Sequence, residues 1–344
     1  MKIFLDDSKC REQLFPFTYT KHVADIRIGI LTIREKWEKL TGETICTSIE
    51  DKDSKYLTIS ANVIPTINNY KSILGQISGI TIDTDIKTLD HPWEIFQLND
   101  RAIREDFELL TRYKISRPVS KTNHCTAEEN IFISEGAIVE HCFINASTGP
   151  VYIGKNTTLM EGNMIRGPFA ICEGATLKMG SKVYGATTIG PYCIAGGEIK
   201  NSMLSGYSNK AHDGYLGDSV LGEWCNLGAG TSNSNIKNTA GEVKYKISDE
   251  SEAIAAGNKG GLLMGDYSRA AINTSFNTGT VVGICCNIFG RRFPEKSVAN
   301  FSWGDERYHF DKAIRDIDNW KKLKGHAVTE SEKELLHKLY TSNL

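Results

Sequence analysis

The chain has 344 residues, of which 24% are charged, and its formal net charge is −2. This balance excludes a strongly basic nucleic-acid binder, and no apolar run approaches the roughly 20 residues of a membrane span. We therefore expect no nucleic-acid partner and no membrane partner. The nine cysteines are scattered without metal-ligand spacing, and the first residues, MKIFLDDSKC, lack the apolar core of a secretory leader. We expect free thiols, no metal site and a cytoplasmic location.

Residues 1–115 predict an α/β domain. The stretch MKIFLDD is typical of a short strand, and ADIRIGILTIREKWEKL predicts a strand or helix start that continues as a helix. The stretch HPWEIFQLNDRAIREDFELLTRY contains a second helix, for which Asn99 or Asp100 is the expected N-cap. Residues 116–130, SRPVSKTNHCTAEEN, are polar and predict a linker.

Residues 131–290 carry a repeat of six residues. At this step the chain has a branched aliphatic residue seven times in succession: Ile153, Leu159, Ile165, Ile171, Leu177, Val183 and Ile189. Mostly small residues follow each of these at the fourth position. A period of six fits neither a helix nor a simple strand alternation, and it predicts a β-solenoid whose stacked turns bury one aliphatic per face.

The repeat is interrupted once and then ends. Residues 233–261 are polar and aperiodic, which predicts a long loop leaving the solenoid, and the six-residue step returns at Met264. Residues 291–344 predict a C-terminal extension, in which TESEKELLHKLY has the pattern of a capped amphipathic helix. We expect this helix to pack on the solenoid or on a neighbour and to cover the exposed final turn.

The six-residue step resembles the hexapeptide repeat of left-handed β-helix acyltransferases. Residues 198–231 add ordered motifs, which are E-x-K, then KAHDGYLGD, then NLGAGT. These are similar to the acetyltransferase half of the bifunctional N-acetylglucosamine-1-phosphate uridyltransferase/glucosamine-1-phosphate N-acetyltransferase family. The resemblance covers about residues 130–290. It implies an α/β domain followed by a left-handed parallel β-helix and a C-terminal helix, assembled as a homotrimer.

The resemblance also implies a set of site residues. His212 falls on the catalytic base, and Ala229 falls on a backbone contact to acetyl-CoA. Sugar-phosphate-binding positions fall on Lys182, Lys200, Tyr215, Asn226 and Asn235. The chain departs from the family pattern beside His212, where one glycine is missing, and Asp213 and Gly214 replace the usual pair before the tyrosine.

These residue types suit N-acetyl transfer. An amine that attacks the thioester of acetyl-CoA must lose a proton, and imidazole exchanges a proton near neutral pH. Backbone N–H groups in Gly228-Ala229-Gly230 can stabilise the oxyanion, and lysines can bind a sugar 1-phosphate. By itself a lone histidine on a solenoid turn is more often an ordinary surface residue, and Lys200 could equally be a solvated lysine. Asn226 and Asn235 could instead bond backbone at turns.

The first domain resembles a truncated and diverged sugar nucleotidyltransferase. The segment LFPFTYTKHVADIRIGILTIREKW is similar to the one after the family's glycine-rich nucleotide loop, but the loop position here reads LDDSKCREQL, without glycine. Arg11 or Lys21 could meet a phosphate there, and Asp6 and Asp7 could hold Mg²⁺ if the domain is active. Arg291-Arg292 could meet the 3′-phosphate of coenzyme A, although a solvated pair is the simpler reading.

The sequence therefore leaves three alternative functions. The first is transfer of acetyl from acetyl-CoA to an amino-sugar 1-phosphate in sugar-nucleotide biosynthesis, with His212 as general base. The second is a Mg²⁺-dependent sugar-1-phosphate nucleotidyltransferase that makes a nucleotide sugar. The third is a non-catalytic module that binds sugar nucleotides or serves assembly.

Overall fold

An α/β domain lies beside a long solenoid. The computed structural model describes residues 2–49, 55–77, 85–247 and 251–342. In the first domain three parallel strands form a sheet in the order β4-β1-β5, made of β1 (Lys2–Asp6), β4 (Ile45–Cys46) and β5 (Tyr56–Ser60). Two antiparallel pairs accompany it: β2 (Arg27–Ile28) with β3 (Leu31–Thr32), and β6 (Val63–Ile64) with β7 (Lys87–Thr88). The expected strand in MKIFLDD is therefore confirmed.

The helices of this domain are α1 (Ile33–Thr41), α2 (Tyr70–Ile77), α3 (Glu94–Gln97) and α4 (Asn99–Thr111). Helix α1 follows β3 directly and begins at a capping box made by Thr32 and Glu35. The expected N-cap of α4 is wrong, because Leu98 holds that position and no side chain caps it. The Asn99 side chain instead accepts a hydrogen bond from the Gly29 N–H (2.9 Å) and donates one to the Ala186 carbonyl (2.8 Å). It therefore connects the domain to the solenoid.

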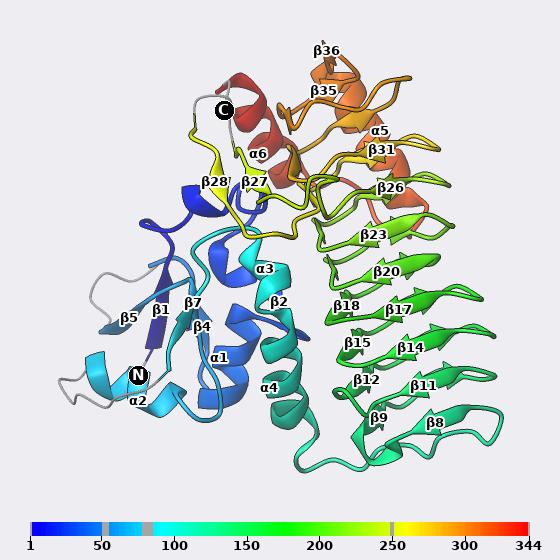
Figure 1. Cartoon of the computed structure of the whole chain (residues 1–344). Coiled ribbons are helices and arrows are strands. Elements are labelled where there is room, and N and C mark those ends of the chain that lie inside the picture. Colours follow the sequence, from blue (N-terminus) through cyan, green and yellow to red (C-terminus); the bar gives the residue numbers. More distant parts are fainter. Residues whose placement is uncertain (1, 50–54, 78–84, 248–250, 343–344) are drawn as a thin grey trace.

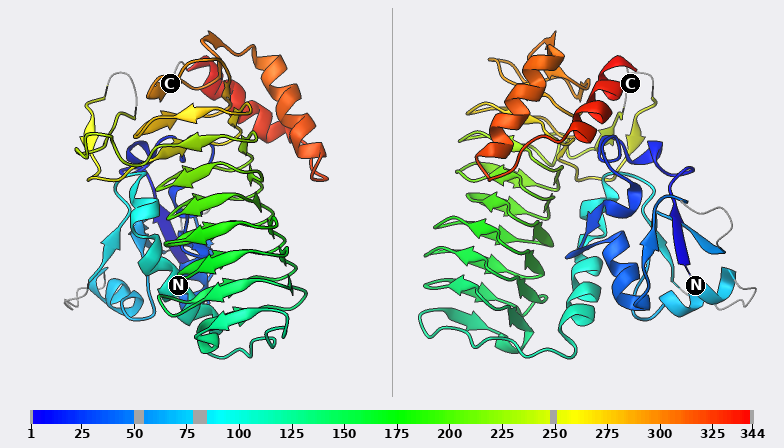
Figure 2. Two further views of the ribbon diagram at one scale, coloured as in Figure 1. Left: turned by 45° about the vertical axis from the view of Figure 1, so that its right-hand side comes forward. Right: turned by 180° about the vertical axis from the view of Figure 1, so that it is seen from behind.

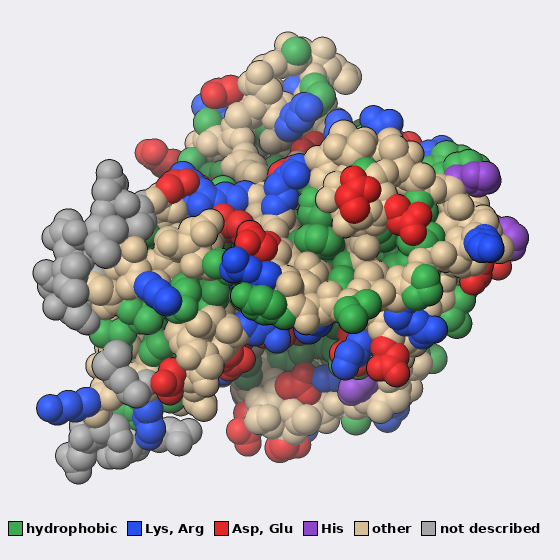
Figure 3. All heavy atoms as spheres, turned by 90° about the horizontal axis from the view of Figure 1, so that it is seen from below, with side chains coloured by type: hydrophobic (Ala, Val, Ile, Leu, Met, Phe, Trp, Pro, Cys, Tyr) green, Lys and Arg blue, Asp and Glu red, His purple; other side chains and the backbone are tan. Residues whose placement is uncertain are grey.

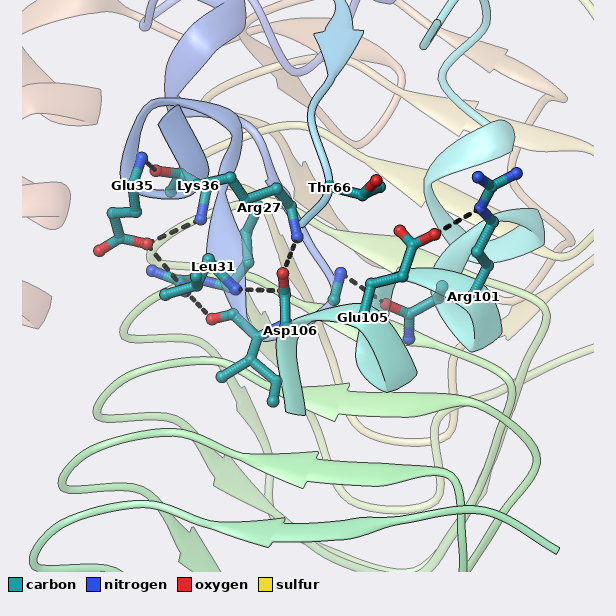
Figure 4. A network of polar contacts seen from close by, with 12 residues as sticks. Arg27, Leu31, Glu35, Lys36, Thr66, Arg101, Glu105 and Asp106 are labelled. Carbon is teal, nitrogen blue, oxygen red and sulfur yellow. Dashed lines mark hydrogen bonds and ion pairs between the residues drawn. The ribbon is translucent and has the colours of Figure 1, made fainter. Parts of the chain in front are cut away.

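A buried ion pair organises the side of the domain next to the solenoid. The Asp106 carboxylate on α4 pairs with Lys36 on α1, and both side chains are almost fully buried. The same carboxylate accepts hydrogen bonds from the N–H groups of Ile30 (2.7 Å) and Leu31 (3.0 Å). Figure 4 shows the carboxylate between these donors, with α4 in front of the solenoid strands. Burial raises the pKa of Asp106, and Lys36 opposes that shift.

The solenoid turns each contribute strands to three sheets. The first sheet contains β8 (His124–Thr126), β11 (Phe143–Asn145), β14 (Met164–Arg166), β17 (Lys182–Tyr184), β20 (Glu198–Lys200) and β23 (Tyr215–Gly217). The second contains β9 (Ile131–Ile133), β12 (Val151–Ile153), β15 (Phe169–Ile171), β18 (Thr187–Ile189), β21 (Met203–Leu204), β24 (Val220–Leu221), β29 (Leu262–Met264), β32 (Thr280–Val282) and β34 (Ser297–Val298). The third contains β10 (Ile138–Val139), β13 (Thr158–Leu159), β16 (Thr176–Leu177), β19 (Ile194–Ala195), β22 (Asn209–Lys210), β25 (Asn226–Leu227), β30 (Arg269–Ala270), β33 (Asn287–Ile288), β35 (Ser302–Trp303) and β36 (Glu306–Arg307).

The six-residue step is confirmed as the interior of this solenoid. The seven predicted aliphatics from Ile153 to Ile189 are at most 3% exposed, and they fall on the three sheets in rotation. Neighbouring turns pair in parallel, for example Ile153 with Ile171 and Ile171 with Ile189. Figure 2 shows the turns stacked as a column, with the α/β domain along its side. The first sheet already includes β8, so its pairing begins inside the segment predicted as a linker.

The segment that interrupts the repeat forms a β-hairpin outside the solenoid. After β26 (Ser232–Asn233) the chain leaves the solenoid, forms an antiparallel hairpin of β27 (Lys244–Tyr245) and β28 (Ile254–Ala255), and returns at β29. Strand β24 pairs directly with β29, and β26 pairs with β31 (Ser275–Phe276), so the solenoid continues across the gap. The Tyr245 ring stacks on Trp93 of the first domain at 5.2 Å. Residues 248–250 of the predicted loop lie outside the described residues.

Two helices pack at the late turns, α5 (Phe310–Lys322) and α6 (Glu330–Thr341). The expected cap of α6 is confirmed as a capping box of Thr329 and Glu332. The helices pack on a cluster of hydrophobic side chains from successive turns, which includes Trp224, Tyr267 and Phe301. The edge of the final turn is instead paired by β36, which runs antiparallel to β35.

No helix of the described part of the chain is both long and apolar enough to cross a membrane. The end of the molecule at the first turns carries basic and acidic side chains interspersed among hydrophobic ones (Figure 3).

Candidate active site

His212 lies on the corner between the third and first sheets. Residues 211–214 connect β22 to β23, and the His212 side chain is exposed there. The previous turn approaches this corner at Gly197, whose φ of 72° favours glycine; a Cβ there would lie 2.7 Å from the His212 carbonyl oxygen. On the following turn the Gly230 N–H bonds the Asp213 carbonyl (2.9 Å). Close backbone packing on both sides therefore holds the histidine at a defined place.

Lys210 supports the same corner from inside. Its side chain is 1% exposed, and its ammonium donates hydrogen bonds to the carbonyls of Gly196 (3.0 Å) and His212. Burial lowers the pKa of Lys210 to about 8, and the nearby Asp213 carboxylate opposes that shift. A buried lysine that bonds the histidine backbone positions the histidine without presenting its own charge to the surface.

Two columns of outward side chains run along the first sheet beside His212. The register places Lys182, Glu198 and Tyr215 in one column, and Tyr184 and Lys200 in the next. The residues between the two columns point into the core and are at most 1% exposed; they are Val183, Ile199 and Leu216. Three of the predicted sugar-phosphate residues therefore lie on one face of one sheet, on consecutive turns.

Tyr215 lies flat across this face. A Cβ at Gly217 would collide with the Tyr215 hydroxyl, so the glycine makes room for the ring. The Asp218 carboxylate beside it is 3% exposed and accepts hydrogen bonds from the side-chain amides of Asn201 (2.7 Å) and Asn235. Burial raises the pKa of the Tyr215 phenol, and Asp218 adds to the effect. The predicted residue Asn235 thus reaches the site from beyond the end of β26.

The glutamate of this face is hydrogen-bonded within the protein, whereas its two lysines have no carboxylate partner among the described residues. Glu198 accepts a hydrogen bond from the Tyr184 hydroxyl (2.6 Å), which raises the pKa of Tyr184 to about 12. Lys200 lies over the Tyr184 ring, with its nitrogen 5.7 Å from the ring centroid. Among the described residues neither Lys200 nor Lys182 has a carboxylate partner. The face therefore presents two lysines without an ion-pair partner in the described part of the chain, beside a glutamate whose carboxylate accepts a hydrogen bond from the Tyr184 hydroxyl.

The remaining predicted residues lie elsewhere on the solenoid. Asn226 is on β25 in the third sheet, where it accepts a hydrogen bond from Asn209 (3.4 Å) and does not share the face of Tyr215. Ala229 lies on the next turn at the same corner as His212, and its carbonyl accepts a hydrogen bond from the Asn273 N–H (2.7 Å). Arg291 and Arg292 are exposed beyond β33.

The charged residues of the first domain are arranged differently. Lys21 is partly buried against the solenoid, where its ammonium lies 2.8 Å from Glu223 and 3.1 Å from Asp266. Burial alone would lower the pKa of Lys21, but the two carboxylates outweigh it and raise that pKa. Asp7 pairs with Arg11 (2.7 Å) and His22 (3.3 Å).

Asp6 is also engaged, since its carboxylate accepts the Ser8 N–H at 3.0 Å. These carboxylates bond protein donors, and the described residues contain no cluster of three metal-ligating side chains. Binding of Mg²⁺ at this loop would require the carboxylates of Asp6 and Asp7 to exchange these donors for the ion.

Comparisons with known proteins agree with both halves of the chain. The family model described as sugar nucleotidyl transferase matches residues 2–73 and 51–115. The protein named bifunctional protein GlmU from Methanococcus maripaludis is 24% identical over 278 residues, which cover 75% of this chain and 59% of that protein. The chain is therefore similar to GlmU-like bifunctional sugar nucleotidyltransferase/acetyltransferase proteins over most of its length, and its residues 2–115 match the sugar nucleotidyl transferase family model.

Other GlmU-like relatives match shorter stretches. The Sulfurisphaera tokodaii protein named bifunctional sugar-1-phosphate nucleotidylyltransferase/acetyltransferase is 26% identical over 244 residues, covering 70% of this chain and 52% of that protein. The Trichodesmium erythraeum bifunctional protein GlmU is 31% identical over 117 residues, or 33% of this chain. The chain spans between about half and three fifths of the length of the two relatives that match it over the longer stretches.

The structure adds residues that the sequence reasoning did not single out. Tyr184, Asp218 and Lys210 contact or support the predicted side chains. Glu198 belongs to the E-x-K motif, and Asp218 ends the motif KAHDGYLGD, so both had a sequence signal. Tyr184 had no such signal, because its place beside Lys200 depends on the register between turns.

Proposed function

We propose that the solenoid transfers an acetyl group from acetyl-CoA to the amine of an amino-sugar 1-phosphate, with His212 as general base. The observation that carries this proposal is the placement of His212 at a corner directly next to the face of Tyr215, Lys200 and Lys182. An exposed imidazole and free cations on adjacent turns are what an amine acceptor with an anionic group requires. The Sulfurisphaera tokodaii relative, named as a nucleotidylyltransferase/acetyltransferase, supports an acetyltransferase activity.

The reaction needs one proton acceptor and one oxyanion site. The amine nitrogen forms a bond to the thioester carbonyl carbon, and His212 takes the proton that the nitrogen loses. The carbon–sulfur bond then breaks, and the coenzyme A thiolate leaves and takes up a proton. The N–H groups of Gly228 and Gly230 already donate to the carbonyls of Ala270 and Asp213. The Ala229 N–H, one turn beyond His212, is therefore the proposed donor to the carbonyl oxygen as it becomes negative.

The acceptor is proposed to lie along the first sheet. Lys182 and Lys200 bind its phosphate, since both ammonium groups lack a carboxylate partner in the described part of the chain. Tyr215 and Asn235 bind the sugar ring, where Asp218 holds the Asn235 amide in place. Asn226 is proposed to bind the sugar phosphate across a homotrimer contact, because it lies on a different sheet of its own chain from Tyr215. Ala229 is proposed to contact acetyl-CoA through its backbone.

The test is coenzyme A release from acetyl-CoA with glucosamine 1-phosphate. We expect His212→Asn to lower kcat about 10²–10⁴-fold, the usual contribution of a general base. His141→Asn is a matched control, because His141 is exposed and precedes β11 at the equivalent corner of the first sheet on an earlier turn. Equal rates for the two variants and the unmodified protein would refute the proposal.

A second candidate is nucleotidyl transfer by the first domain. The family match over residues 2–115 favours it. The carboxylates of Asp6 and Asp7 oppose it, because they already bond donors within the protein. Its test is pyrophosphate release from a nucleoside triphosphate, Mg²⁺ and a sugar 1-phosphate. We expect no release above background, because the loop has neither free carboxylates nor the glycines that let backbone amides approach phosphates.

A further inference from the structure

A groove continues from the proposed phosphate site toward the first turns. It lies on the first sheet, has a volume of about 1040 Å³, and is bounded at its far end by residues 119–128. Its floor is the outward face of β17, β14, β11 and β8, so it spans three strand spacings, or roughly 14 Å. A monosaccharide phosphate held by Lys182 and Lys200 would leave this floor uncovered.

The groove is basic. Arg166, Lys182 and Lys121 line it, and Glu128 is the one carboxylate among its lining residues. In the described part of the chain none of the three cations has a carboxylate partner, and all three are exposed. Arg166 lies one turn from Lys182 toward the groove's far end, in the neighbouring column of outward side chains, two residues after the Met164 that pairs with Lys182. This position suits a second phosphate after the first.

The far part of the groove is aromatic. The rings of His124 and Phe143, on neighbouring strands, stack with centroids 5.0 Å apart and an interplanar angle of 17°. Phe143 is 53% exposed and Met164, the next residue in its column, is 54% exposed. An exposed aromatic ring beyond two cations is the arrangement that binds a nucleotide base by stacking.

We infer that the preferred acceptor is an amino-sugar 1-phosphate that carries a nucleotide, that is, a nucleoside-diphosphate-linked amino sugar. The inference rests on the proposed function and names the substrate of that same site. The sugar lies at Tyr215, the two phosphates lie along Lys182 and Arg166, and the base lies on Phe143. The groove runs away from His212 on the phosphate side of the acceptor, whereas Ala229 lies one turn in the opposite direction. The groove therefore belongs to the acceptor and not to the adenosine of coenzyme A.

The experiment compares UDP-glucosamine with glucosamine 1-phosphate as acceptors for the full chain, by coenzyme A release. We expect kcat/KM to be at least about tenfold higher for UDP-glucosamine. Arg166→Gln and Phe143→Ala should each raise the KM for UDP-glucosamine about tenfold. They should leave the KM for acetyl-CoA and the kinetics with glucosamine 1-phosphate unchanged. Arg315→Gln, at an exposed arginine on α5, is the matched control.

The outcomes separate this inference from the proposed function. Acetylation of glucosamine 1-phosphate with no preference for UDP-glucosamine would overturn the inference and leave the proposed function intact. A raised KM for acetyl-CoA in the groove variants would overturn it as well, since the groove would then hold coenzyme A. If neither amino sugar is acetylated, the proposed function fails. Calorimetry then tests the groove separately, by measuring whether UDP-glucosamine binds and whether Arg166→Gln weakens that binding.

Discussion

The two halves of the molecule use their charged residues in opposite ways. In the first domain the charges near the expected nucleotide loop are paired within the protein: Asp7 with Arg11, and Lys21 with Glu223 and Asp266. On the first sheet of the solenoid, Lys182 and Lys200 face outward without a carboxylate partner among the described residues. Paired and buried charges fix how parts of a chain pack, while exposed unpaired cations remain free to bind a ligand.

The buried pair of Lys36 and Asp106 offers the largest stability test of this contrast. Lys36→Met would leave the Asp106 carboxylate buried without its cation and should lower the free energy of unfolding by about 3–5 kcal/mol. Lys39→Met is the control, because Lys39 is exposed on the same helix and should change stability by less than about 0.5 kcal/mol. Urea denaturation measures both. Similar losses for the two variants would mean that the pair does not hold the domain.

The lowered pKa of Lys210 predicts that the stability of the protein depends on pH. Its folded pKa of about 8 is below the ordinary lysine value, so the unfolded chain binds more protons between about pH 8 and 10.5. The free energy of unfolding should therefore rise with pH over this range, by roughly 3 kcal/mol in all. The same rise should be absent from Lys210→Met. Parallel pH profiles for the two proteins would contradict a buried lysine at this corner.

Substitution of an unpaired lysine on the first sheet is expected to have the smallest effect, on acceptor binding alone. Lys182→Gln should raise the KM for the acceptor about tenfold and leave kcat within about twofold, because a phosphate contact made equally in ground and transition states changes binding alone. Lys178→Gln provides a control, since residue 178 lies on the neighbouring third-sheet side of the same turn. A fall in kcat with an unchanged KM would place Lys182 in the chemistry instead.

The solenoid was predictable because its signal is local and repeated. Each aliphatic from Ile153 to Ile189 is interior, so the six-residue period records the shape of every turn. The motif around His212 likewise lies within one turn and its neighbours. By contrast, the roles of Lys21 and Asn99 depend on partners far away in the chain, Asp266 and Ala186. Lys21 has the same appearance in sequence whether it binds a phosphate or docks a domain, and Asn99 has the same appearance whether it caps a helix or bridges two domains.

The place of Asn226 shows a second limit. Its motif suggests a residue of the acceptor site, yet the turn geometry puts it on the third sheet beside Asn209. The reverse holds for Tyr184, which no motif marks and which the register brings beside Lys200 and Glu198. Residue identity suggests a chemical role, while the face on which a residue lies is known only from the register between turns.

The central claim is that the chemistry belongs to the solenoid corner and that the first domain supports it without transferring nucleotides. One assay of the full chain tests it most directly. The protein is supplied with acetyl-CoA, an amino-sugar phosphate, a nucleoside triphosphate and Mg²⁺, and coenzyme A and pyrophosphate are measured together. We predict coenzyme A release that His212→Asn abolishes and His141→Asn preserves, with no pyrophosphate. Pyrophosphate release, or coenzyme A release that survives in His212→Asn, would contradict the account.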